Sequence, residues 1–397
     1  MEEQLLELIK KYGEPDALID HWEDNNFGYA IWGFNDTIEW DSQHIVQTDK
    51  QIKQSLDALQ SRLNDWKYHD NEISAIGFIN YNFKNILYNH ISFKTHDSEI
   101  PYLFFGQPSL IKKYKIESDN SRIVNVKLKK DLESFKDYEK KIKKIKSELK
   151  KGNVYQINYT NNKSYYLENS AFKLYLSLRN NVKPKYGYYI RYKDIYLLSF
   201  SPELFFMKEN NTIKTAPMKG TRKRSINSKK DKQLKLELKN SIKDRAEHLM
   251  IVDLLRNDLG KIAIPGSIKV NDIFKIESFN TVHQMISNIT AKLGDEITEI
   301  DIIEALFPGG SITGAPKESA MKIIDELEDY SRDIYTGSIG YIKSNGDLNF
   351  NIAIRTMTVN KENGEYPVGG GIVWDSKAED EWDEAQLKSK ILNDIIK

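Results

Sequence analysis

A lysine near the middle of the chain lies in a segment that would fix its position. Lys219 stands between Pro217 and Gly220 in the run PMKGT. Proline fixes the approach of the backbone and glycine permits an otherwise strained φ angle, so the amine is expected at a defined bend. A lysine amine is nucleophilic only when neutral, so burial or a neighbouring cation would have to lower its pKa from about 10.4. The alternative interpretation is a solvated lysine in a surface turn.

Glu203 is a candidate proton donor. It follows Pro202 and precedes the apolar run Leu-Phe-Phe. A carboxyl group in such surroundings is expected to lose hydration, which raises its pKa and allows it to carry a proton near neutral pH. A salt bridge at the end of a strand is the other interpretation of this residue.

Three further carboxylates suggest a metal site. Glu381, Glu384 and Lys388 recur at i, i+3 and i+7 on one face of a predicted helix, and Glu247 lies in a second predicted helix with an apolar run. Buried carboxylates that face each other need a cation between them. Oxygen ligands without cysteine or a histidine cluster favour Mg²⁺. A surface pair between Glu384 and Lys388 is the alternative.

Two predicted strands would carry parts of such a site. Residues 154–160 alternate in polarity, which places Gln156 on the same face as every second residue after it. Residues 197–207 are predicted as a single strand with Glu203 inside it.

Two helices and two glycine-rich segments complete the predicted framework. Spacings of three and four between apolar residues predict a surface helix over residues 131–151, and residues 243–258 fit a buried helix. Residues 309–314 lead into a helix that starts near Pro316, where free N–H groups could hold a carboxylate. The glycines at 369–371 could do the same from a second side.

Composition excludes several classes of function. Lys and Arg together number 58, as do Asp and Glu, so no basic field indicates a nucleic-acid partner, and the lysine-rich helix faces are interpreted as solvated. No apolar run approaches the length of about 20 residues that a membrane span needs, and the start of the chain does not resemble a signal peptide. We expect a cytoplasmic protein without nucleic-acid or membrane partners.

The absence of cysteine limits the chemistry further. With no cysteine, the chain can form neither a disulfide nor a thiolate metal site, and it has no cysteine nucleophile. An enzyme that takes ammonia from glutamine through a cysteine nucleophile would need that thiol. Any ammonia used here must therefore come from a partner or from solution.

Eight blocks of sequence occur in the order typical of one enzyme family. They are 152–160 (GNVYQINYT), 201–205 (SPELF), 217–221 (PMKGT), 243–260 (KDRAEHLMIVDLLRNDLG), 307–317 (FPGGSITGAPK), 335–341 (YTGSIGY), 354–356 (IRT) and 369–376 (GGGIVWDS). In these blocks the chain resembles the chorismate-utilising enzymes, which include anthranilate synthase component I, aminodeoxychorismate synthase component I, isochorismate synthase and salicylate synthase.

The resemblance implies an architecture. It is an α+β fold in which two facing antiparallel β-sheets form a sandwich core flanked by helices, with the site between the sheets. Residues 1–125 are expected to supply the N-terminal part of the sandwich, and residues 126–397 the chorismate-binding catalytic region.

The resemblance also assigns roles to individual residues. Those implied for catalysis are Lys219, Glu203 and His283; for substrate binding, Gln156, Ser311, Thr313, Tyr335, Arg355, Gly369, Gly370 and Lys388; and for Mg²⁺, Glu247 and Glu384 with Glu381 nearby. Family members that add water to chorismate carry a lysine base where this chain has Gln156. Because glutamine cannot accept a proton at neutral pH, ammonia is the expected nucleophile.

Lys219 selects a branch of the family. Anthranilate synthase and isochorismate synthase carry alanine or another small residue at this place, whereas a lysine marks the aminodeoxychorismate synthase branch. The implied reaction joins chorismate and ammonia into 4-amino-4-deoxychorismate, a precursor of p-aminobenzoate and folate, with a glutamine amidotransferase subunit as partner. The alternatives are the anthranilate synthase branch and a non-catalytic subunit that binds a metabolite.

Overall fold

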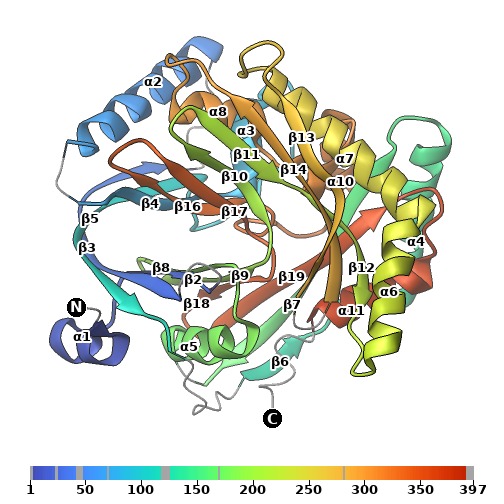
Figure 1. The fold of residues 1–397 in the computed structure, drawn as a ribbon, viewed down its shortest axis with the longest axis horizontal. Helices are drawn as coiled ribbons and strands as arrows, with labels where there is room; N and C mark the ends of the chain where they lie inside the picture. Colours follow the sequence, from blue (N-terminus) through green and yellow to red (C-terminus); the bar gives the residue numbers. More distant parts are fainter. Residues whose placement is uncertain are drawn as a thin grey trace.

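The structure is a computed structural model that describes residues 3–22, 26–41, 48–68, 71–117, 126–168, 170–279 and 282–389. The strands in these residues belong to one long sheet, antiparallel except where the short β1 (Glu3–Gln4) joins β5. The sheet folds over on itself, so that its two halves face each other (Figure 1). The predicted α+β fold with facing antiparallel layers is confirmed.

The first half-sheet is the upper one in Figure 1. In order of pairing its strands are β4 (Ile73–Ile79), β16 (Ser338–Lys343), β17 (Leu348–Ile352), β10 (Leu204–Glu209), β11 (Thr212–Ala216) and β14 (Val282–Lys292), with β12 (Met218–Lys223) and β13 (Lys269–Ser278) both beside β14.

The second half-sheet lies below it. In order of pairing its strands are β2 (Ala17–His21), β8 (Tyr186–Tyr192), β9 (Ile195–Ser201), β18 (Thr356–Asn360), β19 (Asn363–Ile372), β7 (Gln156–Leu167) and β6 (Val126–Lys130), and the two-residue β15 (Gly314–Ala315) also pairs with β7.

Two long strands form the bend between the half-sheets. β3 (Phe27–Trp40) and β5 (Leu103–Lys115) pair along most of their length, and β2 joins one end of this pair while β4 joins the other. The pairing slips between Phe34 and Asp36, directly after Gly33, whose φ of +70° suits glycine. A bulge of this kind bends and twists the strand, which turns the second half-sheet back over the first.

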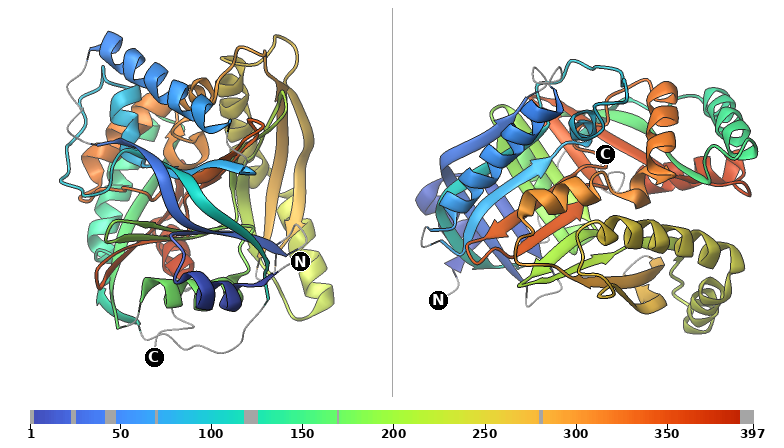
Figure 2. Two further views of the ribbon diagram at one scale, coloured as in Figure 1. Left: turned by 90° about the vertical axis from the view of Figure 1, so that its left-hand side faces the viewer. Right: turned by 90° about the horizontal axis from the view of Figure 1, so that it is seen from above.

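Apolar side chains fill the space between and outside the half-sheets. The core between them comes from alternate residues of facing strands, among them Ile31, Phe78, Ile190 and Ile339, all fully buried. Helices cover the outer faces: α2 lies over the first half-sheet, and α1 and α5 lie beneath the second (Figure 2). Each sheet face therefore has an apolar cover, as a layered domain requires.

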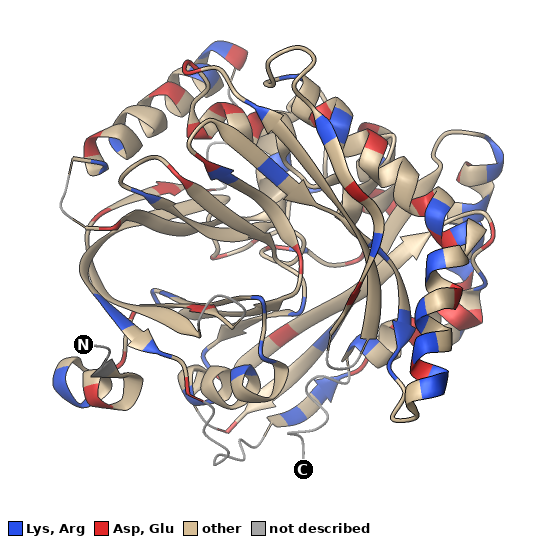
Figure 3. Cartoon of the chain, viewed as in Figure 1, with Lys and Arg blue, Asp and Glu red and all other residues tan. Residues whose placement is uncertain are grey.

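The helices are α1 (Leu5–Tyr12), α2 (Asp49–Trp66), α3 (Lys84–Leu87), which follows a 3₁₀ turn (Tyr81–Phe83), α4 (Phe135–Lys150), α5 (Ala171–Val182), α6 (Ser228–Asn240), α7 (Ile242–Gly260), α8 (Glu299–Leu306), α9 (Gly310–Thr313), α10 (Lys317–Leu327) and α11 (Ala378–Lys388). In Figure 3, lysines and arginines gather on α4 and α6 with acidic residues between them. No helix among the described residues is long and apolar enough to cross a membrane.

Two predicted elements differ from the structure. The helix predicted over residues 131–151 begins at Phe135, because the side chain of Ser134 caps it by accepting the N–H of Asp137 at 3.2 Å. The single strand predicted over residues 197–207 is wrong, because the chain leaves β9 after Ser201 and enters β10 at Leu204 in the other half-sheet. The proposed division at residue 125 adjoins the segment 118–125, which lies outside the described residues, and it stays a prediction.

Candidate active site

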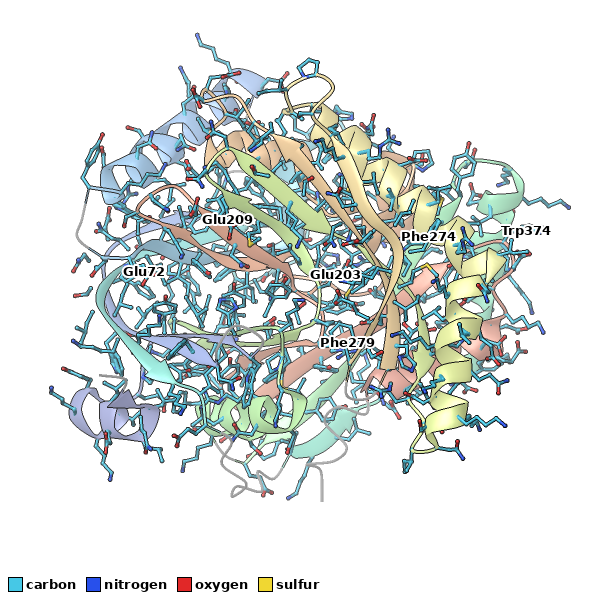
Figure 4. The ribbon with its side chains drawn as sticks, viewed as in Figure 1. Glu72, Glu203, Glu209, Phe274, Phe279 and Trp374 are labelled. Atoms are coloured by element: carbon cyan, nitrogen blue, oxygen red, sulfur yellow. The ribbon has the colours of Figure 1, made fainter. Side chains whose placement is uncertain are left out.

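The crossing between β9 and β10 places Glu203. Pro202 has no N–H to donate to a ladder, which favours the break. The hydroxyl of Ser201 donates to the carbonyl of Ile352 at 2.6 Å and accepts the N–H of Glu203 at 3.2 Å, so the turn is fixed from both sides. Glu203 is 6% exposed and lies in the interior of the molecule in Figure 4.

Ser311 joins Glu203 to Lys219. Its hydroxyl donates to Oε1 of Glu203 at 2.9 Å, and its backbone carbonyl accepts from Nζ of Lys219 at 3.2 Å. Lys219 lies on β12, and the next residue, Gly220, has a φ of +76° that confirms the predicted bend. One residue of α9 thus holds the candidate acid and the candidate nucleophile together.

The pKa values of the two groups are displaced in the directions that catalysis would need. Burial lowers the pKa of the Lys219 amine, and nearby Glu203 opposes this effect while Lys388 adds to it. Burial raises the pKa of the Glu203 carboxyl, against the hydrogen bond from Ser311 and the charge of Lys219. A neutral amine and a protonated carboxyl are therefore both more accessible than they would be in water.

Gln156 approaches Lys219 from the other half-sheet. Gln156 is fully buried at the start of β7, and neither its Oε1 nor its Nε2 has a hydrogen-bond partner. A Cβ atom built on Gly371 of β19 would lie 3.1 Å from Nε2 of Gln156 and 3.2 Å from Nζ of Lys219. Buried amide atoms are rarely left without partners, so a ligand is expected to satisfy this glutamine.

We expect Gly371→Ala to lower kcat/KM by roughly 10- to 100-fold without unfolding the chain, because the added methyl group would push Gln156 and Lys219 apart. Steady-state kinetics and a thermal melt would measure the two effects. Gly260→Ala is the matched control, since the nearest atom to its new methyl group is 4.0 Å away, and it should behave as the parent. Parental activity in Gly371→Ala would show that these two side chains do not work together at this glycine.

Arg355 offers an unpaired positive charge. It follows β17 with a φ of +51°, and its carbonyl accepts the N–H of Phe200 at 3.1 Å. Burial lowers the pKa of its guanidinium, and no carboxylate of the described residues forms an ion pair with it. Tyr335 is 6% exposed. Burial raises the pKa of nearby Tyr366, an effect that Arg355 opposes and Tyr335 strengthens. A guanidinium without an anion indicates a ligand carboxylate, which it can bind with two hydrogen bonds.

Carboxylates from two helices lie near the glycine run. A Cβ atom on Gly370 would lie 3.5 Å from Oε2 of Glu381 and 3.8 Å from Oε1 of Glu384. Glu384 pairs with Lys388 at 2.7 Å, which is the main cause of its lowered pKa. On α7, Oε1 of Glu247 is buried without a hydrogen-bond partner, and burial raises the pKa of this carboxyl.

These acidic residues fit a cation in part. These oxygen donors suit Mg²⁺, which often binds through one or two protein carboxylates together with substrate oxygens. Oε1 of Glu247 has no hydrogen-bond partner, although Nζ of Lys243 lies 3.8 Å from it. Within the described ranges, no three acidic, histidine or cysteine side chains come close enough to form a complete metal cage. An ion here would need further ligands from water or a substrate.

The remaining predicted site residues have other contacts. Thr313 donates its hydroxyl to the carbonyl of Gly309 at 2.9 Å, and the carbonyl of Gly369 accepts from Nζ of Lys388 at 2.9 Å. His283 lies on β14 with its Nδ1 2.8 Å from the hydroxyl of Ser278 and its Nε2 3.1 Å from Oδ1 of Asp231. Since both ring nitrogens are engaged by these groups, a catalytic role for His283 stays a prediction.

Comparison with known proteins shows the family to which the chain belongs. A family model described as chorismate binding enzyme matches residues 15–394. The chain belongs to this family. Aminodeoxychorismate synthase component 1 of Salmonella typhimurium is 43% identical over 248 residues, which are 62% of this chain and 55% of that protein. Anthranilate synthase component 1 of Saccharolobus solfataricus is 38% identical over 259 residues, which are 65% and 62% of the two chains.

The chain thus spans 55% and 62% of the length of these two curated relatives. The crystal structure of anthranilate synthase component I from Streptococcus pneumoniae shares the fold, with a TM-score of 0.79 over 92% of both chains at 24% identity. This likeness confirms the fold of the chain.

Sequence reasoning missed two buried ion pairs. Lys317 donates to Oδ2 of Asp258 at 2.8 Å and joins the start of α10 to the end of α7. Arg332 pairs with Glu328 at 2.7 Å between α10 and β16. The signal in the sequence is an ordinary i, i+4 charge pair and a lysine beside a proline, and neither pattern distinguishes a buried group from a solvated one.

Proposed function

We propose that the chain is an aminodeoxychorismate synthase component I, which converts chorismate and ammonia into 4-amino-4-deoxychorismate. The observation that carries the proposal is the bridge by Ser311 between a buried carboxyl group and a lysine whose pKa is lowered. An enzyme in which ammonia attacks the chorismate ring directly does not need a lysine at position 219. The unpaired Arg355 supplies a partner for a carboxylate of chorismate.

The residues suit two allylic displacements. In the first, the neutral Nζ of Lys219 attacks C2 of the chorismate ring, the double bonds shift, and the C4 hydroxyl leaves as water with the proton of Glu203. In the second, ammonia attacks C4, the double bonds shift back, and the C2–Nζ bond breaks. Gln156 lies beside Lys219 with two unsatisfied amide atoms that can orient the substrate or the ammonia but cannot take a proton.

Glu247 and Glu384, with Glu381 beside them, are the residues proposed to hold Mg²⁺. When bound, the ion would offset the negative charge of a substrate carboxylate and fix its position. Without it, the carboxylate of Glu247, whose Oε1 lies 3.8 Å from Nζ of Lys243, would repel the substrate carboxylate. We also propose a glutamine amidotransferase as the partner, because no residue of this cysteine-free chain can act as the thiol nucleophile of such a reaction.

Anthranilate synthase component I is the second candidate. The similarity to the Saccharolobus solfataricus protein, at 38% identity, favours it. In that reaction ammonia attacks C2 and pyruvate is lost, so Lys219 would have no covalent part. A non-catalytic subunit that binds a metabolite is disfavoured because Lys219, Glu203 and the candidate metal carboxylates are all present.

The product identifies the reaction. We expect purified protein, given chorismate, Mg²⁺ and ammonium at alkaline pH, to form a nonfluorescent compound that keeps the pyruvyl group and has an amine in place of a hydroxyl. Omission of Mg²⁺ with EDTA present should abolish its formation. Mass spectrometry and fluorescence would distinguish it from anthranilate, which would support the second candidate. No turnover, with or without an amidotransferase subunit, would support the non-catalytic one.

A further inference from the structure

The guanidinium of Arg332 is buried and uses all five of its N–H donors. Nε donates to Oε2 of Glu328 at 2.7 Å, and one terminal nitrogen donates to Oε1 of Glu328 at 2.7 Å and to the carbonyl of Asn158 at 2.6 Å. The other terminal nitrogen donates to the carbonyl of Ile312 at 3.0 Å and to the hydroxyl of Thr336 at 3.3 Å. The Arg332 side chain is only 1% exposed.

Glu328 extends this network to a further point on β7. Its Oε1 also accepts the N–H of Thr160 at 2.9 Å and the hydroxyl of Thr160 at 2.7 Å. On the other side, the ring of Tyr81 lies 4.7 Å from the central carbon of the guanidinium, which is close enough for a cation–π contact. The pair is therefore held on every side by groups from different elements.

Three of these contacts lie one or two residues from groups of the active site. Ile312 follows Ser311, whose hydroxyl and carbonyl hold Glu203 and Lys219. Asn158 is two residues from Gln156 on the same face of β7, and Thr336 follows Tyr335. The two carbonyls and the one hydroxyl that Arg332 binds thus belong to the three segments that present the acid and lysine, the amide and the tyrosine.

We propose that Arg332, oriented by Glu328, is a positioning residue that fixes these three segments relative to one another. It touches neither Lys219 nor Glu203, and it acts through the backbone carbonyls of Asn158 and Ile312. This inference rests on the proposed function in one respect: the three segments that Arg332 aligns carry the residues that are proposed to act on chorismate. An arginine is needed because its planar fork reaches acceptors in several directions, whereas a lysine has three donors at one point.

The first test uses variants that keep the core free of unpaired charge. Loss of Arg332 alone would leave the Glu328 carboxylate buried without a partner, which could unfold the chain. The double variant Arg332→Met/Glu328→Gln removes both charges at similar volume. We expect it to fold, as shown by circular dichroism and a thermal melt, and to consume chorismate with kcat lowered roughly 10- to 100-fold. Folded double variant with parental kcat would overturn the proposal.

Arg332→Lys separates geometry from charge. It keeps the ion pair with Glu328 but cannot reach the carbonyls of Asn158 and Ile312 together, so we expect kcat to fall nearly as far as in the double variant. Full activity in Arg332→Lys would mean that charge alone suffices and that the proposed positioning is wrong. Arg179→Lys is the matched control. Arg179 is also buried and lies away from the site, where its guanidinium donates to the carboxylate of Asp20 at 3.1 Å. It should lower the melting temperature and leave kcat unchanged.

A coupling measurement tests the route through Ser311. If Arg332 acts by placing α9, the effect of Ser311→Ala on kcat should be much smaller in the Arg332→Met/Glu328→Gln background than in the parent. Full additivity of the two effects would exclude this route.

Chemical labelling tests the geometry even if the protein does not consume chorismate. Without Arg332, the carbonyl of Ser311 is expected to move from Nζ of Lys219, so acetic anhydride should acetylate Lys219 several-fold faster, as measured by mass spectrometry. Parental labelling rates in both Arg332 variants would overturn the proposal. Anthranilate as the product would overturn the proposed function alone, because chorismate consumption and Lys219 labelling would still report on Arg332.

Discussion

Lys219→Ala is expected to lower kcat/KM for amination of chorismate at C4 by at least about 10³-fold, or roughly 4 kcal/mol of transition-state stabilisation. The reason is that the nucleophile of the first displacement is lost, while the bridge from Ser311 to Glu203 remains. The assay should measure C4 amination at saturating ammonium and again with an amidotransferase subunit. The protein should still fold, because among the described residues the removed amine makes a single hydrogen bond, to the Ser311 carbonyl at 3.2 Å.

Lys223→Ala is the control for this variant. Lys223 lies on the same strand β12 but is exposed, so its loss should leave the kinetics unchanged. If Lys219→Ala aminated chorismate at C4 as fast as the parent with both sources of ammonia, the covalent route would be wrong, although the choice of substrate could still hold.

Glu203→Gln is expected to lower kcat by about 10²- to 10⁴-fold, because the C4 hydroxyl must then leave without a proton from the enzyme. Glutamine keeps the shape of the side chain and can still accept the hydroxyl of Ser311. Binding of chorismate should therefore change little, and the loss should fall on kcat instead of KM. Glu209→Gln, at the exposed end of β10, should be neutral.

The pH profile separates proton donation from a purely structural role of Glu203. Burial raises the pKa of Glu203, so in the parent the protonated form is lost, and the rate of the first displacement falls, as pH rises through that raised value. The lowered pKa of Lys219 acts in the opposite sense, since its neutral form appears as pH rises. In Glu203→Gln the descending limb should be absent. If the variant retained both limbs, Glu203 would not be the group that titrates.

Local sequence predicted the burial of Glu203 correctly but its element wrongly. The apolar run after it indicated burial, and the carboxyl is 6% exposed. The same run continues the strand pattern of residues 197–201, so periodicity alone predicts one strand. The crossing between the half-sheets depends on the hydrogen bond from Ser201 to Ile352, which is 151 residues away in sequence. Such a long-range contact leaves no periodic signal.

The network around Arg332 was beyond sequence reasoning for a related reason. Glu328 and Arg332 have the spacing of a solvated helix pair, but α10 ends at Leu327 and the pair turns inward. Its burial follows from carbonyls on β7 and α9, which come together only in the folded sheet. By contrast, the bend at Lys219 was predictable, because it needs a positive φ angle at residue 220 and the glycine there adopts one easily.

The two runs of paired strands come together where catalysis is proposed. Starting from the bend of β3 and β5, one run leads out to β14 with β12 beside it, and the other to β19 and β7 with β6 beyond them. The two runs meet where Gly371 approaches Gln156 and Lys219. The site is thus a seam that closes a nearly complete ring. Small changes of twist at each strand pair add up around such a ring. A substitution in a distant strand can therefore displace the residues at the seam. Activity should therefore respond to distant strand substitutions before the melting temperature does.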